Sequence, residues 1–329
     1  MRRLLKQIII LCCCWVGLVS VAAKAGVESS SNQSINIVAS IPPLAGLVYP
    51  LLDDQDTITV ILDVGSSPHG FQLRPSHMRA LQQADLMLMV GTPVDAWMQR
   101  AAERSDSAKR QLFDPAQSDW LPRRDSGVWD RKHHASHGYG GHRHGHTHHS
   151  GLQAVARIDG HIWLDIERAV NWVADMSLAL QQLRPERAAE FQAREEQVVA
   201  SLIAARQAWS EQLQPYQDKP FVVMHDAYQY FELRFGLRAA GAVYMDPEVA
   251  PSVRRIQEIR DTLVAQGVVC VYQEPQFPTD RLRSVLRGMD VGLGQLDPLG
   301  ADGVLVPYEQ FYDRLVKSFI ACMQDASAN

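Results

Sequence analysis

Eight of the twelve histidines in this sequence lie within seventeen consecutive residues, from His133 to His149. Imidazole binds borderline transition metals near neutral pH, so this density of histidine predicts binding of Zn, Ni or Cu ions. The segment also contains four glycines and almost no apolar side chains, so we expect a disordered loop. An engineered tag or a merely solvated linker are the alternatives. The accessory ligands in this loop would be His133, His134, His137, His142, His144, His146, His148 and His149.

Isolated histidines offer a second candidate metal site. His69 and His225 each follow an apolar run typical of a strand, and Asp297 follows another such run directly. His225 is also expected to begin a helix. Ligands of open α/β sheets bind outside the carboxyl ends of the strands, so these side chains are expected to meet in a cleft. His161, which follows the histidine-rich loop, could join them. A single histidine at a strand end more often caps a helix, so the prediction depends on their joint placement.

The elements that must position these residues are short apolar runs that alternate with helical patterns. This alternation is typical of a mostly parallel α/β sheet. The expected strands are residues 35–40, 58–64, 86–90, 221–224, 237–244, 268–272 and 291–296. The expected helices are residues 44–52, 77–84, 94–104, 166–183, 252–266, 279–288 and 308–323.

One helical pattern is much longer than the others and begins at Pro185. Its apolar residues recur at steps of seven and four, which places them on one helix face. They are Phe191, Val198, Leu202, Trp209 and Leu213. At 1.5 Å per residue the helix would span about 40 Å, so we predict a rigid strut between two lobes. An ordinary long core helix is the alternative.

The predicted fold is two Rossmann-like α/β lobes with parallel sheets, joined by this long helix, with a metal cleft between the lobes. A signal peptide is expected at residues 1–25 and an N-terminal lobe at 26–183, with the disordered histidine-rich loop at about 121–151. The linking helix is expected at residues 184–215 and the C-terminal lobe at 216–329.

The first 25 residues have the features of a cleavable secretory signal. A basic start precedes an apolar stretch at residues 8–21, and Ala23-Lys24-Ala25 offers a cleavage site. A retained anchor, or a lipoprotein modified at one of the cysteines at positions 12–14, are the alternatives. Cleavage removes four basic and no acidic residues, so the net charge changes from −5 to −9. Such an acidic chain is a poor nucleic-acid binder.

Two cysteines, Cys270 and Cys322, remain after cleavage. In an oxidising compartment an even pair most simply forms a disulfide. Two free buried thiols, or a zinc site made by the two cysteines, are the alternatives.

Five motifs occur in order along the chain. They are SSPHGFQLRPSH around His69, GHIWLD around His161, HDAYQYF from His225, EPQF from Glu274 and LDPLG from Leu296. With these motifs the chain resembles the zinc-binding solute-binding proteins of bacterial ABC importers, the ZnuA type. The resemblance includes the histidine-rich insertion before GHIWLD and the cysteine pair near the C-terminus.

The resemblance implies that the chain is a periplasmic zinc-capture protein and not an enzyme. One tight Zn²⁺ site would be made by His69, His161 and His225, with further weakly held ions in the histidine-rich loop. Asp297 corresponds to an acidic residue beside the metal. Pro68 replaces a glutamate that some members use as a ligand, so either Asp297 or water would complete the site. Three imidazoles and at most one carboxylate favour Zn over Mn.

The implied partners are an inner-membrane zinc permease and its cytoplasmic ATPase. An accessory periplasmic zinc chaperone is a further candidate, nucleic acid is excluded, and a monomer is expected. The alternatives are a secreted zinc-dependent hydrolase, a manganese-specific protein of the same fold, and a metal buffer or adhesin that uses the loop itself. Three histidines and one open coordination position are also typical of catalytic zinc sites. However, the sequence contains neither the H-E-x-x-H motif of metalloproteases nor the G-x-S-x-G motif of serine hydrolases.

Overall fold

The computed structural model describes residues 34–91, 93–104, 110–112, 120–124, 158–300 and 302–325. The expected signal peptide and all eight loop histidines lie outside these residues, so both remain predictions. Across the described ranges, no helix combines the length and apolar character needed to span a membrane.

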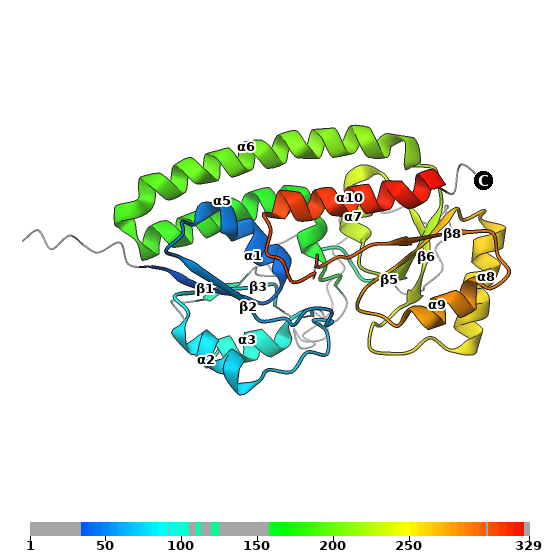
Figure 1. Ribbon diagram of the computed structural model, residues 1–329, viewed down its shortest axis with the longest axis horizontal. Helices are drawn as coiled ribbons and strands as arrows, with labels where there is room; N and C mark the ends of the chain where they lie inside the picture. The colour runs from blue at the N-terminus through cyan, green and yellow to red at the C-terminus, as the bar shows by residue number, and fades with distance from the viewer. Residues whose placement is uncertain are drawn as a thin grey trace, which may run out of the picture. The chain divides into compact units, whose positions relative to one another are not determined.

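Eight strands of the described chain form two four-stranded parallel sheets, which confirms the predicted α/β class (Figure 1). The first sheet has the order β2-β1-β3-β4, and the second has the order β6-β5-β7-β8. The strands of the first sheet are β1 (Asn36–Ala39), β2 (Thr57–Val60), β3 (Leu86–Met89) and β4 (Arg110–Leu112). Those of the second are β5 (Phe221–His225), β6 (Ala239–Tyr244), β7 (Cys270–Gln273) and β8 (Gly292–Gln295).

Alternating residues along each central strand belong to different hydrophobic clusters. Ile37 of β1 and Leu88 of β3 join the largest cluster, whereas Val38 and Met87 join a smaller one with α2 (Pro75–Gln83) and α3 (Ala96–Ala102). In the second sheet, β5 alternates in the same way between the largest cluster and one made with α8 (Val253–Ala265) and α9 (Thr279–Leu286). Both faces of each sheet are therefore covered, as parallel sheets require.

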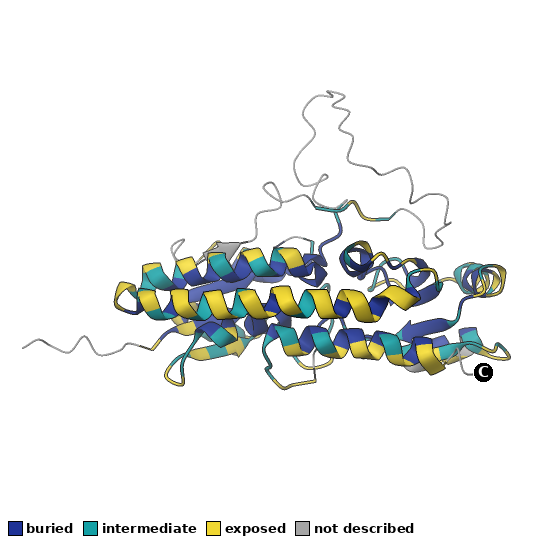
Figure 2. Ribbon diagram, turned by 90° about the horizontal axis from the view of Figure 1, so that it is seen from above, coloured by how far each residue is buried: buried dark blue, intermediate teal, exposed yellow. Residues whose placement is uncertain are grey.

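The largest hydrophobic cluster extends across the inner faces of both sheets. Its helices are α1 (Pro42–Val48), α5 (Ile166–Leu183), α6 (Ala188–Leu213), α7 (Gln229–Phe235) and α10 (Tyr308–Asp325). The long helix α6 buries four of its five expected apolar residues, and Val198 is half-buried. Figure 2 shows the outer side of α6 exposed along its length. The predicted long helix is confirmed, and its apolar stripe packs into a core shared by the two sheets.

The C-terminal helix α10 contacts elements of both predicted lobes, although we expected it to pack within the C-terminal lobe alone. It packs on α1 and α6 as well as on β8. The hydroxyl of Tyr312 donates to the carbonyl of Leu164 at 2.8 Å. A Cβ at Gly46 of α1 would lie 2.8 Å from the carbonyl oxygen of Val306, so glycine permits this close approach. The region from Ser34 onward is one compact unit, and the lobe boundaries remain predictions.

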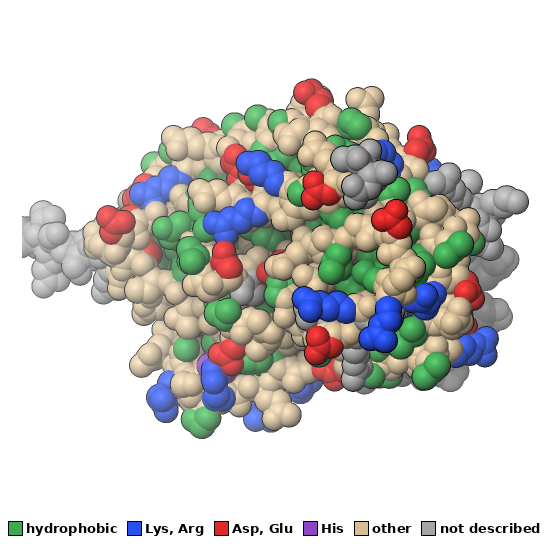
Figure 3. Space-filling view, turned by 45° about the vertical axis from the view of Figure 1, so that its right-hand side comes forward, with side chains coloured by type: hydrophobic (Ala, Val, Ile, Leu, Met, Phe, Trp, Pro, Cys, Tyr) green, Lys and Arg blue, Asp and Glu red, His purple; other side chains and the backbone are tan. Residues whose placement is uncertain are grey.

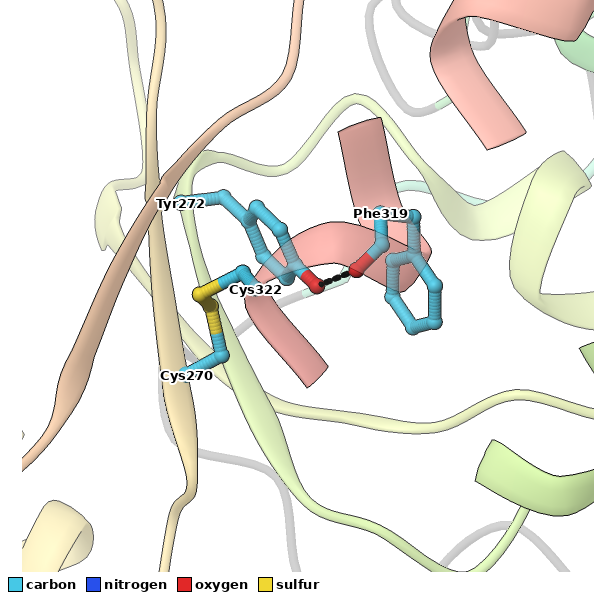
Figure 4. Close-up of a disulfide and its surroundings, with 4 residues drawn as sticks. All are labelled: Cys270, Tyr272, Phe319 and Cys322. Carbon is cyan, nitrogen blue, oxygen red and sulfur yellow. Dashed lines mark hydrogen bonds between the residues drawn. A yellow bond between two sulfur atoms is a disulfide. The ribbon is translucent and has the colours of Figure 1, made fainter. Parts of the chain in front are cut away.

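Cys270 of β7 and Cys322 of α10 form a disulfide with their Cα atoms 6.1 Å apart (Figure 4). Beside it, the hydroxyl of Tyr272 donates to the carbonyl of Phe319 at 2.5 Å. The expected disulfide is confirmed over the two alternatives. The disulfide joins the second sheet to α10, the helix that also packs on α1 and α6.

Candidate metal centre

His69 lies in the loop between β2 and α2, and its side chain is partly exposed. Its backbone N–H donates to Oγ of Ser67 at 3.3 Å. The preceding residue, Pro68, is held by Trp97, whose indole N–H donates to the Pro68 carbonyl at 2.7 Å. Trp97 belongs to α3, so the helix layer outside the first sheet positions this histidine.

His161 lies directly before a short 3₁₀ turn, Ile162–Leu164, and is buried. Its backbone N–H donates to Oδ1 of Asp159 at 3.0 Å, and its ring Nδ1 lies 2.7 Å from the same oxygen. A carboxylate that binds Nδ1–H leaves the lone pair of Nε2 free for a metal.

His225 is the last residue of β5 and is also buried. We expected it to begin a helix, but the next helix, α7, starts at Gln229. The backbone N–H of His225 donates to Oε1 of Glu274 at 3.2 Å, and its Nδ1 lies 2.6 Å from Oε2 of Glu274. Glu274 follows β7, the strand beside β5, so the sheet itself brings the two residues together.

The three histidines direct their Nε2 atoms at one point. Nε2 of His161 lies 3.3 Å from that of His69 and 3.2 Å from that of His225. Two nitrogens on a tetrahedral Zn²⁺, each about 2.0–2.1 Å from the ion, would be about 3.3 Å apart. The three imidazole rings line one cavity, together with Trp163 and Phe277. The spacing therefore fits a single tetrahedral cation.

Burial sets the protonation of the ligands. It lowers the pKa of His69 and of His161 well below the ordinary value, and the neighbouring imidazoles lower both further. Burial is the largest single effect on His225 and by itself lowers the pKa, but the charge and hydrogen bond of Glu274, together with the charges of Asp226 and Asp159, outweigh it and raise the pKa of His225. Neutral imidazoles are the form that binds metal, so two of the three ligands are ready at neutral pH.

Asp297 stands apart from this group. Its Oδ1 accepts from Nε2 of Gln276 at 2.9 Å and from the backbone N–H of Leu299 at 3.0 Å. In the described part of the chain, the three histidines form the one group of three or more potential ligands whose ligand atoms all lie within 4.8 Å of one another, and Asp297 is not part of it. The identity of a fourth ligand therefore remains a prediction.

Sequence reasoning missed the two carboxylates behind the ligands, Asp159 and Glu274. Asp159 lies two residues before His161, directly before the GHIWLD motif, and Glu274 is the first residue of the EPQF motif. Glu274 is 49 residues from His225 in the chain, and only the pairing of β5 with β7 reveals the contact.

A model of the family described as zinc-uptake complex component A, periplasmic, matches residues 37–322. The chain belongs to this ZnuA family. It is 30% identical over 313 residues to the high-affinity zinc uptake system protein ZnuA of Brucella abortus, covering 91% of this chain and 93% of the relative. It is 32% identical over 304 residues to the protein of the same name from Yersinia pestis, covering 88% and 92%.

A crystal structure of ZnuA has the same fold as this ZnuA-family chain. The TM-score is 0.67 at 20% sequence identity, and the similarity covers 89% of this chain and 98% of the other. The family and the fold expected from the five motifs are thereby confirmed.

Proposed function

We propose that this chain captures Zn²⁺ in the periplasm and delivers it to an ABC permease for import. The observation that carries the proposal is that Nε2 of His161 lies 3.2–3.3 Å from Nε2 of both His69 and His225, with the ligand atoms of all three within 4.8 Å of one another. Membership in the ZnuA family supports it, as do the relatives named for high-affinity zinc uptake.

The donor set favours zinc over manganese as the cargo. Three imidazole nitrogens suit tetrahedral Zn²⁺, whereas Mn²⁺ binds such ligands weakly and prefers oxygen donors. Asp159 and Glu274, the carboxylates in contact with His161 and His225, lie on the Nδ1 side of the rings, away from the convergence point. They can balance part of the charge of the ion without binding it.

A zinc hydrolase is the second candidate, and the nearby acidic groups argue against it. Glu232 of α7 is bound to Arg124 and accepts from the backbone N–H of Ala239. Glu274 is engaged with His225. A general base needs hydrogen-bond reach to a metal-bound water, and both glutamates have other partners.

Several features support export and a membrane partner. The N-terminal residues have the features of a secretory signal, the disulfide suits an oxidising compartment, and the family description is periplasmic. On the face in Figure 3, Lys and Arg side chains lie among acidic and uncharged ones. We infer an inner-membrane permease with a cytoplasmic ATPase as the partner, an accessory zinc chaperone as a further one, and a monomeric chain.

Zinc titration with metal analysis tests the proposal. The wild-type protein should hold one tight Zn²⁺, and so should a variant that lacks residues 133–149. The triple variant His69→Ala, His161→Ala and His225→Ala should lose the tight ion. His77→Ala is the matched control, because His77 contacts Arg74 and Phe71 outside the cluster. Loss of tight binding in the loop deletion alone would instead assign the site to the loop, and zinc-dependent turnover of peptides or esters would favour the hydrolase.

A further inference from the structure

Two chain segments form a narrow ribbon that leads into His161. Residues 120–124 lie beside residues 158–161, with Pro122 paired antiparallel to Ile158. The backbone N–H of Asp159 donates to the carbonyl of Leu121 at 2.8 Å. The position of His161 therefore depends on what holds this ribbon.

The hydroxyl group of Tyr230, in α7, forms hydrogen bonds with both segments of the ribbon. The hydroxyl accepts from the backbone N–H of Leu121 at 2.9 Å and donates to the carbonyl of Asp159 at 3.0 Å. The residue is buried, with 1% of its surface exposed. Because α7 begins four residues after His225, this hydroxyl links the segment that carries His161 to the one that follows His225.

Arg124 makes a second link between the same two regions. Its Nη1 donates to Oδ1 of Asp226 at 3.0 Å and to Oε1 of Glu232 at 3.1 Å, and its Nη2 donates to Oε2 of Glu232 at 2.9 Å. Asp226 directly follows His225 in the sequence. The side chains are 14% exposed for Arg124, 3% for Asp226 and 4% for Glu232, so water screens these ion pairs little.

We propose that Tyr230 and Arg124 are positioning residues that set the separation of His161 from His225 and thereby the geometry of metal coordination. His225 is fixed by the second sheet, whereas His161 follows the ribbon, which belongs to neither sheet. The Tyr230 hydroxyl and the Arg124 guanidinium connect that ribbon to the residues that follow His225. This inference rests on the proposed zinc site and adds the residues that hold its shape.

Tyr230→Phe tests the hydroxyl, because it removes both hydrogen bonds and keeps the ring. Tyr272→Phe is the matched control, since it removes one buried hydroxyl bond to a backbone carbonyl beside the disulfide, in β7. Zn²⁺ affinity by chelator competition and the visible spectrum of the Co²⁺-loaded protein report the strength and geometry of binding. We expect Tyr230→Phe to weaken Zn²⁺ binding about tenfold and to change the Co²⁺ spectrum, as for other groups that orient metal ligands. Tyr272→Phe should leave both unchanged, even if it lowers the melting temperature.

Arg124 is tested by two substitutions in the full-length protein. Arg124→Gln removes the charge and should weaken Zn²⁺ binding at least tenfold with an altered Co²⁺ spectrum. Arg124→Lys keeps the charge but cannot bridge two carboxylates with a planar fork, so it should restore the affinity and spectrum only in part.

The outcomes separate this inference from the function on which it rests. If the triple histidine variant loses tight Zn²⁺ while Tyr230→Phe and Arg124→Gln keep wild-type affinity and Co²⁺ spectrum, the positioning role is overturned. The contacts of α10 with the turn after His161 would then hold that histidine by themselves. If the triple histidine variant retains tight Zn²⁺, the proposed site fails instead.

Discussion

Nδ1 of His225 lies 2.6 Å from Oε2 of Glu274, a carboxylate that is 1% exposed and comes from the end of the neighbouring strand. Glu274 also accepts the backbone N–H of His225 at 3.2 Å. One buried carboxylate thus fixes both the backbone and the ring of a candidate ligand. A buried acid costs free energy to ionise, and burial raises the pKa of Glu274 accordingly. Its contacts with the backbone and the ring of His225 orient the imidazole for metal binding.

Glu274→Gln should weaken Zn²⁺ binding about tenfold or more, because the amide keeps the shape of the side chain but not its charge. Chelator competition at neutral pH measures the effect. Glu258→Gln is the control, since Glu258 pairs with Arg254 on the exposed side of α8. Equal affinities in the two variants would show that Glu274 has no part in metal binding.

Zinc binding should leave the radius of gyration nearly unchanged. The helices α6 and α10 both pack into the hydrophobic cluster that extends over the two sheets, so wide hinge closure would expose buried apolar surface. We expect local changes in the loops around His161 and His225. Small-angle scattering of the apo and Zn²⁺-loaded protein measures this, and a large contraction on binding would refute the prediction.

Acid should weaken the fold through Asp56, whose carboxylate binds Nη1 and Nη2 of Arg187 at 3.0 Å each, just before α6. Burial by itself raises the pKa of Asp56, but the bonds from Arg187, Ile35 and Asp53 outweigh it and lower the pKa below 3.8. As the pH falls, Asp56 is therefore protonated at a higher pH in the unfolded chain than in the folded protein. The stabilisation by Asp56 is therefore complete above about pH 4 and is lost as the pH falls through the folded-state pKa.

Asp56→Asn should lower the free energy of unfolding by about 3 kcal/mol at neutral pH, as expected for one partner of a buried ion pair. Its stability should also depend less on pH below 4 than that of the wild type. Urea unfolding between pH 2.5 and 7 measures both effects, with the exposed neighbour Asp54→Asn as control. A parallel pH dependence in wild type and Asp56→Asn would contradict the assignment.

Removal of the disulfide should lower stability without loss of zinc binding. In the chain-entropy model, closing a loop of about 50 residues contributes about 4 kcal/mol. The double variant Cys270→Ala and Cys322→Ala should therefore unfold at lower denaturant concentration by a comparable free energy. Its Zn²⁺ affinity should be unchanged, because neither cysteine lines the metal cavity. A large loss of affinity in folded protein would contradict this.

Local sequence patterns were sufficient for most elements of the fold. The pattern for the helix at residues 166–183 coincides with α5, and the seven-and-four spacing identified the buried face of α6. These predictions succeeded because periodicity reflects which side of an element meets the core. The short strand β4 was missed, since its three residues Arg110, Gln111 and Leu112 show no apolar alternation.

By itself, the sequence was enough to predict most of the elements, the family and three candidate histidine ligands. Only the tertiary structure decided which side chains meet. Parallel pairing of β5 with β7 brings Glu274 to His225, and the fold brings Cys322 to Cys270 across 52 residues of chain. Such contacts depend on sheet order and helix packing, which short-range patterns do not encode. The separation of the Nε2 atoms, and hence the fit to Zn²⁺, is likewise a property of the folded chain.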